Sequence, residues 1–121
     1  MAIVRYMVND VERAISFYVG HLGFKVKEQY GTTFAMITKD DLTLWLSGPQ
    51  TSAAQPMPDG RQPVAGGWNR LVIQVADLEA VVAQLTKSGA VFRNTILSGV
   101  GGKQILVEDP SGNPIELFEA K

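Results

Sequence analysis

The 121 residues match the commonest size of a single domain, and a composition of 45% hydrophobic and 19% charged residues is that of an ordinary globular chain. The chain has 11 basic and 12 acidic residues and no run of like charges, which argues against nucleic acid or anionic membrane as partners. The lack of cysteine excludes disulfides and thiolate chemistry, and no apolar run approaches the roughly 18 residues of a membrane span, so we expect a cytoplasmic protein.

The first half of the chain predicts a strand, a helix and three more strands. Residues 3–8 alternate with the period of two that marks a strand with one face on a core. Asp10 suits the helix N-cap, and Gly23 suits the end of the helix because glycine adopts the left-handed conformation without a Cβ clash. The predicted apolar stripe is Val11, Ile15, Tyr18 and Leu22, and the strands are 24–30, 32–38 and 42–47.

The second half repeats this order. The segment 75–79, VADLE, matches 8–12, VNDVE, 67 positions earlier. A strand is predicted over 69–75, and a helix between Asp77 and Gly89, with Leu78, Val81, Val82 and Leu85 as its stripe. Strands follow at 91–95, 103–108 and 113–119, and Asp109, Pro110 and Gly112 suit a type I turn between the last two.

We therefore predict one α+β domain, residues 1–121, made of two tandem βαβββ modules. The first module is about 1–48 and the second about 68–121. The segment between them, 49–67, contains four of the six prolines. It is interpreted as either a linker or an ordered loop that covers the domain, and the ordered loop is favoured because long structureless loops are unusual in compact domains.

Two motifs near opposite ends of the chain, together with the duplication, resemble the vicinal oxygen chelate superfamily of glyoxalases, bleomycin-resistance proteins and dioxygenases. The first is 8–14, VNDVERA, followed by Phe17-Tyr18 and Leu22-Gly23-Phe24, and the second is 108–118, EDPSGNPIELF. The resemblance implies curled mixed sheets around a cavity, and a homodimer that sometimes completes the cavity across chains. It does not fix the reaction, because one fold supports many sites.

The resemblance also implies which positions would hold a metal. Metal-dependent members take ligands from the first and fourth strands of each module, and these positions are Ile3, Trp45, Arg70 and Glu116 here. Only Glu116 has a suitable donor. We therefore expect no metal and no cofactor. The single histidine, His21, is expected near the end of the first helix, and Asp40-Asp41 is interpreted as a polar turn.

Strand alternation predicts the side chains that face away from the helices. The candidate ligand-binding residues are Arg5, Met7, Trp45, Trp68, Arg70, Gln74, Glu116 and Phe118. This mixture of aromatic and polar groups is typical of a small-molecule pocket, although the same side chains could instead fill an ordinary core. Trp68, after two glycines, either closes over the cavity mouth or anchors the linker.

Three functions remain open at this point. The leading hypothesis is a metal-independent binder of a small, partly aromatic or anionic molecule, similar to the bleomycin-resistance branch. The second is a lyase, isomerase or hydrolase in which Glu116 is the catalytic base and Arg70 or Arg5 stabilises an anionic intermediate. The third is a structural or regulatory dimer with a filled cavity. Arg70 and Glu116 are also predicted to form an ion pair.

Overall fold

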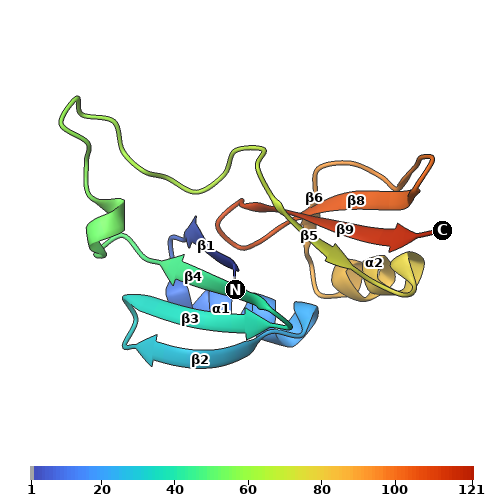
Figure 1. Ribbon diagram of the computed structural model, residues 1–121, viewed down its shortest axis with the longest axis horizontal. Coiled ribbons are helices and arrows are strands. Elements are labelled where there is room, and N and C mark those ends of the chain that lie inside the picture. The colour runs from blue at the N-terminus through green and yellow to red at the C-terminus, as the bar shows by residue number, and fades with distance from the viewer. Residues whose placement is uncertain (1) are drawn as a thin grey trace. The chain divides into compact units, whose positions relative to one another are not determined.

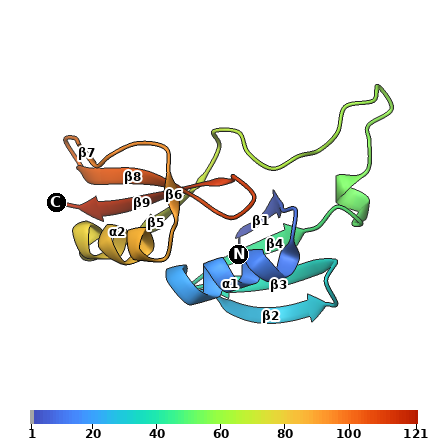
Figure 2. The ribbon, with the colours of Figure 1, turned by 180° about the vertical axis from the view of Figure 1, so that it is seen from behind.

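The computed structural model describes residues 2–121 and consists of two compact units, the first ending at Gly66 and the second spanning Gly67–Lys121. The first unit contains β1 (Ala2–Met7), α1 (Val11–Leu22), β2 (Lys25–Tyr30), β3 (Phe34–Lys39), β4 (Leu42–Ser47) and the short 3₁₀ helix η1 (Ser52–Ala54). Its sheet has the order β1-β4-β3-β2, in which β1 is parallel to β4 and the other neighbours are antiparallel. One face of this sheet is covered by α1 (Figures 1 and 2).

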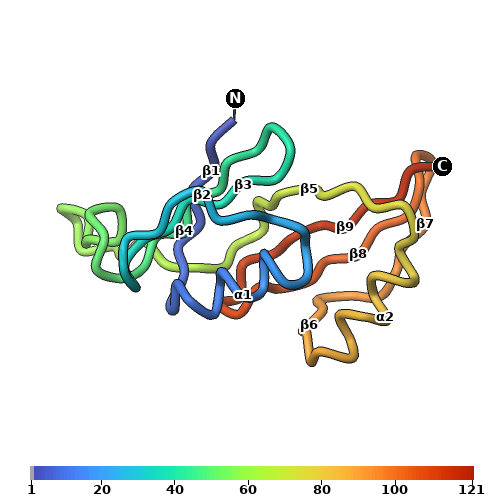
Figure 3. The backbone as a smooth tube through the Cα atoms, turned by 90° about the horizontal axis from the view of Figure 1, so that it is seen from below, coloured from blue at the N-terminus to red at the C-terminus, as the bar shows by residue number. Residues whose placement is uncertain are grey.

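The second unit repeats the arrangement of the first. It contains β5 (Leu71–Gln74), α2 (Leu78–Lys87), β6 (Val91–Phe92), β7 (Leu97–Ser98), β8 (Gly102–Glu108) and β9 (Pro114–Ala120). Its sheet has the order β5-β9-β8-β6, with β7 also paired to β8, and β5 is parallel to β9 (Figure 3). The predicted α+β class and the tandem βαβββ order are therefore confirmed. Neither α1 nor α2 has the length and apolar run needed to cross a lipid bilayer.

The helix boundaries follow from the predicted caps. Asp10 accepts a hydrogen bond from the Arg13 backbone N–H at 3.1 Å, and Asp77 accepts one from the Ala80 N–H at 3.1 Å. Gly23 has φ of 78° and Gly89 has φ of 85°, so both occupy the left-handed region as expected.

The buried face of α1 is wider than the predicted stripe. Ile15 is only half-buried, whereas Ala14 and Phe17 are buried beside Val11, Tyr18 and Leu22. The Phe17 ring packs edge-on against Tyr18, with 5.4 Å between the ring centroids.

The strand predicted at 91–95 is wrong in its length. The structure has two short strands, β6 and β7, with an irregular segment between them. In that segment the Asn94 side-chain oxygen accepts from the Leu106 N–H at 2.9 Å, a donor that a backbone carbonyl would use in a continuous ladder. The predicted strands 69–75 and 32–38 also begin later, at Leu71 and Phe34.

The segment after β4 has hydrogen-bonded turns of its own, as an ordered loop requires. The Thr51 hydroxyl donates to the Gly48 carbonyl at 2.8 Å, and the Met57 N–H donates to the Arg61 carbonyl at 2.8 Å. Further along, Gln62 to Ala65 line a cleft of about 340 Å³ together with the ends of β1 and β4. The loop therefore lies over one end of the first sheet.

Candidate functional site

Each sheet has a face that its own helix covers and an opposite face, which we call the open face. In the first unit the side chains toward α1 are apolar and fully buried, namely Ala35, Ile37, Leu44 and Leu46. On the open face Ile3 and Tyr30 keep about half of their surface, at 52% and 53%. In the second unit Leu71 and Ile73 are buried toward α2, whereas Val72 is 55% exposed and Gln74 is exposed. The alternation predicted for these strands is confirmed.

A row of aromatic side chains crosses the open face of the first sheet. It consists of Tyr30 on β2, Phe34 on β3 and Trp45 on β4, and we call it the aromatic row. The ring centroids lie 5.9 Å apart between Tyr30 and Phe34, and 5.7 Å apart between Phe34 and Trp45. These distances are within the range of favourable ring contacts.

Arg5 on β1 ends the aromatic row. It is the direct cross-strand partner of Trp45, and its guanidinium carbon lies 4.9 Å from the centre of the indole ring. Nη1 of Arg5 also donates to the Ser47 hydroxyl at 3.1 Å. The structure therefore brings together the predicted residues Arg5 and Trp45, while Met7 pairs with Ser47 and lines the cleft beneath the loop. A cation at the end of an aromatic surface suits a planar, anionic ligand.

Tyr30 and Phe34 were missed by the sequence analysis. They flank the turn after Gly31 and pair with each other in the ladder, so the alternation on either side of that turn would have placed both on one face. The Tyr30 hydroxyl donates to the Glu28 carboxylate, and this hydrogen bond, together with the nearby negative charge, raises the pKa of Tyr30 above its usual value of 10.0. Tyr30 therefore stays a neutral phenol throughout the physiological pH range.

The open face of the second unit contains the predicted ion pair. Nε and Nη2 of Arg70 donate to the same oxygen of Glu116, Oε1, at 3.1 and 2.9 Å. Arg70 directly precedes β5, and Glu116 lies on β9 beside Val72, so the parallel pairing of β5 and β9 brings the two side chains together. Glu116 is only 9% exposed. The guanidinium supplies the positive charge that a carboxylate with so little solvent exposure requires.

The second carboxylate oxygen of Glu116 has no hydrogen-bond donor among residues 2–121. Gln74 and Phe118 are direct neighbours on β5 and β9, so these two predicted residues lie on the same open face. The face thus combines a free carboxylate oxygen, a guanidinium, an amide and an aromatic ring.

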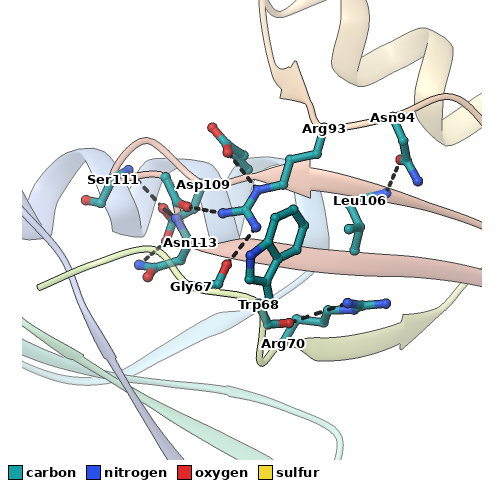
Figure 4. A network of polar contacts seen from close by, with 11 residues as sticks. Gly67, Trp68, Arg70, Arg93, Asn94, Leu106, Asp109, Ser111 and Asn113 are labelled. Atoms are coloured by element: carbon teal, nitrogen blue, oxygen red, sulfur yellow. Dashed lines mark hydrogen bonds and ion pairs between the residues drawn. The ribbon is translucent and has the colours of Figure 1, made fainter.

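Trp68 precedes Arg70 and lies against another cation. The Arg93 guanidinium carbon is 4.5 Å from the centre of its ring, and Nη1 of Arg93 donates to the Gly67 carbonyl at 2.6 Å (Figure 4). Despite this contact, Trp68 is 68% exposed to solvent. One ring face is therefore covered by Arg93, and much of the remaining indole can be reached by solvent.

The positions at which the family resemblance implies metal ligands do not offer a set of donor atoms for a metal ion. Ile3 offers no donor atom, Trp45 offers only a ring already in contact with Arg5, and Arg70 holds its positive charge directly on Glu116. A separate group of carboxylates, Asp77, Glu79 and Glu119, gathers beside α2. Lys103 already donates to Glu79 at 2.5 Å, which lowers the pKa of Glu79 and raises the pKa of Lys103. A lysine ammonium thus already pairs with Glu79 and lies 3.7 Å from Glu119.

Two other features lie away from the open faces. His21 is exposed in the last turn of α1, as predicted. A cleft of about 580 Å³ lies at the start of α1, where its lining includes Asp10, Glu12 and Thr33 but no aromatic ring. The cleft therefore has no aromatic surface on which a ligand could stack. The Arg13 N–H at the start of the helix is already bound by Asp10.

Comparisons with known proteins support the family and the fold predicted for this chain. The family model of the glyoxalase, bleomycin resistance protein and dioxygenase superfamily matches residues 1–117. An antibiotic-binding protein from a Streptomyces species is 25% identical, with a TM-score of 0.73 over 98% of this chain and 93% of that one. A lactoylglutathione lyase from Agrobacterium tumefaciens is 16% identical, with a TM-score of 0.77 over 98% and 92% of the two chains.

A superfamily member from Sphaerobacter thermophilus is 23% identical, with a TM-score of 0.72 over 98% of this chain and 97% of that one. No curated protein sequence matches the chain. The lyase and the antibiotic-binding protein share the fold but not a function, so the side chains on the open faces must distinguish between them.

Proposed function

Because the chain belongs to the glyoxalase/bleomycin resistance protein/dioxygenase superfamily, we propose that it binds a small, partly aromatic or anionic molecule without a metal. The observation that carries the proposal is the aromatic row ending at Arg5. Its side chains lie on the face opposite α1, and Tyr30 is 53% exposed, which supports a surface that a ligand can reach. Binding would cover aromatic surface, which is favourable in itself.

The second open face supports the same proposal from the other unit. Trp68, Gln74 and Phe118 offer an indole, an amide and a second ring, while Arg70 offers a cation to an anionic group. A ligand site with mostly aromatic walls and a few polar groups is typical of small-molecule binding. The antibiotic-binding relative has the same fold, which is in keeping with a binding role.

An enzyme is the second candidate, and one observation favours it. The free Oε2 of Glu116 lies on a carboxylate whose other oxygen is held by Arg70, so a proton could be taken up at Oε2 while the guanidinium stays in place. Arg70, or Arg5, would then stabilise negative charge on an intermediate. In this scheme Glu116→Gln abolishes turnover but retains binding.

The expectations of a homodimer and of a cytoplasmic location belong to the proposal as well. A dimer would cover the unpaired strand edges, and it would allow open faces from two chains to share one ligand. The single-domain assignment, residues 1–121, is likewise part of the proposal.

A thermal-shift comparison of two matched ligands tests the proposed function. We expect the planar 2-naphthoate, at about 100 times its Kd, to raise the Tm by roughly 10 °C, and its saturated analogue, decahydro-2-naphthoate, to raise it far less. The shift should be the same in EDTA and with added Zn²⁺ or Mn²⁺. Trp45→Leu should remove most of it, whereas His21→Gln, a change on the exposed side of α1, should leave it unchanged.

Equal shifts with both ligands would count against an aromatic site. A shift that occurs only with a divalent metal would show that a metal-dependent site exists after all.

A further inference from the structure

Arg93, which the sequence did not single out, makes hydrogen bonds with all three of its guanidinium nitrogens. It lies just after β6, and each of its three guanidinium nitrogens donates a hydrogen bond: Nε to Glu108 at 2.8 Å, Nη1 to the Gly67 carbonyl at 2.6 Å and Nη2 to the Gly112 carbonyl at 2.9 Å. Its side chain is 16% exposed. Because its nitrogens are occupied in this way, Arg93 is suited to hold other parts of the chain and not to contact a ligand itself.

The segment that Arg93 contacts contains two successive glycines and an exposed tryptophan. Gly66 and Gly67 have φ values of 113° and 84°, in the region that glycine adopts easily but other residues do not. Trp68 follows and is 68% exposed, and Arg93 provides the only cation or aromatic contact to its ring found within residues 2–121. Arg93 thus fixes both the backbone before the indole and the face of the indole itself (Figure 4).

The held segment connects directly to the ion pair. Nη1 of Arg70 donates to the Trp68 carbonyl at 3.4 Å, while its other two nitrogens hold Glu116. Contacts therefore run from Glu108 and Gly112 through Arg93 to Gly67 and Trp68, and from there to Arg70 and Glu116. A change at Arg93 would reach the polar groups of the open face through this short segment.

From these contacts we propose that Arg93 is a positioning residue, which holds Trp68 and Arg70 in the arrangement that binds a planar anionic ligand. This inference rests on the proposed function and assigns the open face of the second unit a defined part in it. The planar fork of arginine is needed, because a lysine ammonium cannot bind two carbonyl groups and a carboxylate while also covering an indole ring.

The test uses the fluorescence of Trp68 and the affinity for 2-naphthoate. In a Trp45→Phe background Trp68 is the single tryptophan, since the chain has two. Arg93→Met and Arg93→Lys should each increase acrylamide quenching of Trp68 by about twofold and lower its emission anisotropy, because the guanidinium no longer holds the ring. Calorimetric titration of the same Arg93 variants with Trp45 retained should show a Kd for 2-naphthoate about tenfold higher than that of the unmodified protein. Arg93→Lys keeps the charge and serves as the variant that folds if Arg93→Met does not.

The matched control is Arg61→Met, which removes an arginine whose single ion pair, with Asp59, is highly exposed. It should leave quenching and Kd as they are in the parent. Unchanged quenching of Trp68 in both Arg93 variants would overturn the inference, and so would increased quenching with an unchanged Kd. Failure of the proposed function would be seen differently, as an unmodified protein that does not bind 2-naphthoate at all, while the quenching result still reports on the Arg93 contacts.

Discussion

Replacing Arg70 with methionine is expected to lower the free energy of unfolding more than replacing Arg70 and Glu116 together. Arg70→Met leaves a carboxylate that is only 9% exposed without its counter-charge, which should cost about 2–3 kcal/mol, somewhat below the cost for a fully buried pair because Arg70 itself is partly exposed. Adding Glu116→Gln removes the uncompensated charge, so the double variant should recover part of the loss. Urea denaturation of the four proteins in the double-mutant cycle measures the coupling.

The matched comparison for this cycle is the exposed pair of Arg61 and Asp59, whose side chains are 82% and 54% exposed. Coupling within that pair should be at most a few tenths of a kcal/mol, because exposed ion pairs are screened by water. If the effects of Arg70→Met and Glu116→Gln simply add, within about 0.5 kcal/mol, the two side chains do not stabilise one another and the ion pair is not a feature of the folded protein.

Replacing Gly102 with alanine is expected to be the most damaging change of a single small residue. Gly102 has φ of 154° and pairs with Ala120 at the end of the β8 and β9 ladder. A Cβ at this position would lie 2.1 Å from the Glu119 carbonyl oxygen and 3.0 Å from the Ala120 Cα. Both are backbone atoms, which can move only if the β8–β9 pairing is distorted. We therefore expect the free energy of unfolding to fall by about 3 kcal/mol or more.

Gly101 provides the control, one residue earlier. A Cβ there meets only the far end of the Phe118 ring, at an ordinary 3.8 Å. Gly101→Ala should change the unfolding free energy by less than about 0.5 kcal/mol. Urea midpoints for the two variants measure the difference, and equal midpoints would mean that β8 and β9 are not this close at Gly102.

The repeated fold could be predicted because its signals are local. Asp10 and Asp77 cap helices by hydrogen bonds to residues three positions away, and Gly23 and Gly89 end them through their own backbone conformation. The family resemblance implied that Arg70 and Glu116 occupy equivalent positions on the first and fourth strands of one module, and the predicted ion pair followed from that placement.

The missed features depend on contacts between distant residues. Arg93 meets Gly67, which is 26 positions away, and nothing in the local sequence distinguishes it from a surface arginine. Alternation around the turn could have placed Tyr30 and Phe34 on one face, but their position beside Trp45 depends on the pairing of three strands, in which Phe34 pairs with Ser47 and Trp45 with Met36. The break between β6 and β7 likewise depends on the contact of Asn94 with Leu106 on another strand.

The most direct test of binding on the open faces is a magnetic resonance titration with 2-naphthoate that follows the side-chain N–H signals of tryptophan, arginine, asparagine and glutamine. We expect the indole signal of Trp45 and the Nε–H signal of Arg5 to shift along one saturation curve, because both groups lie on the open face of the first unit. The Nε–H signal of Arg70, on the open face of the second unit, should also shift and saturate. Shifts confined to Asn9 and Gln50, which line the cleft at the start of α1, would contradict it.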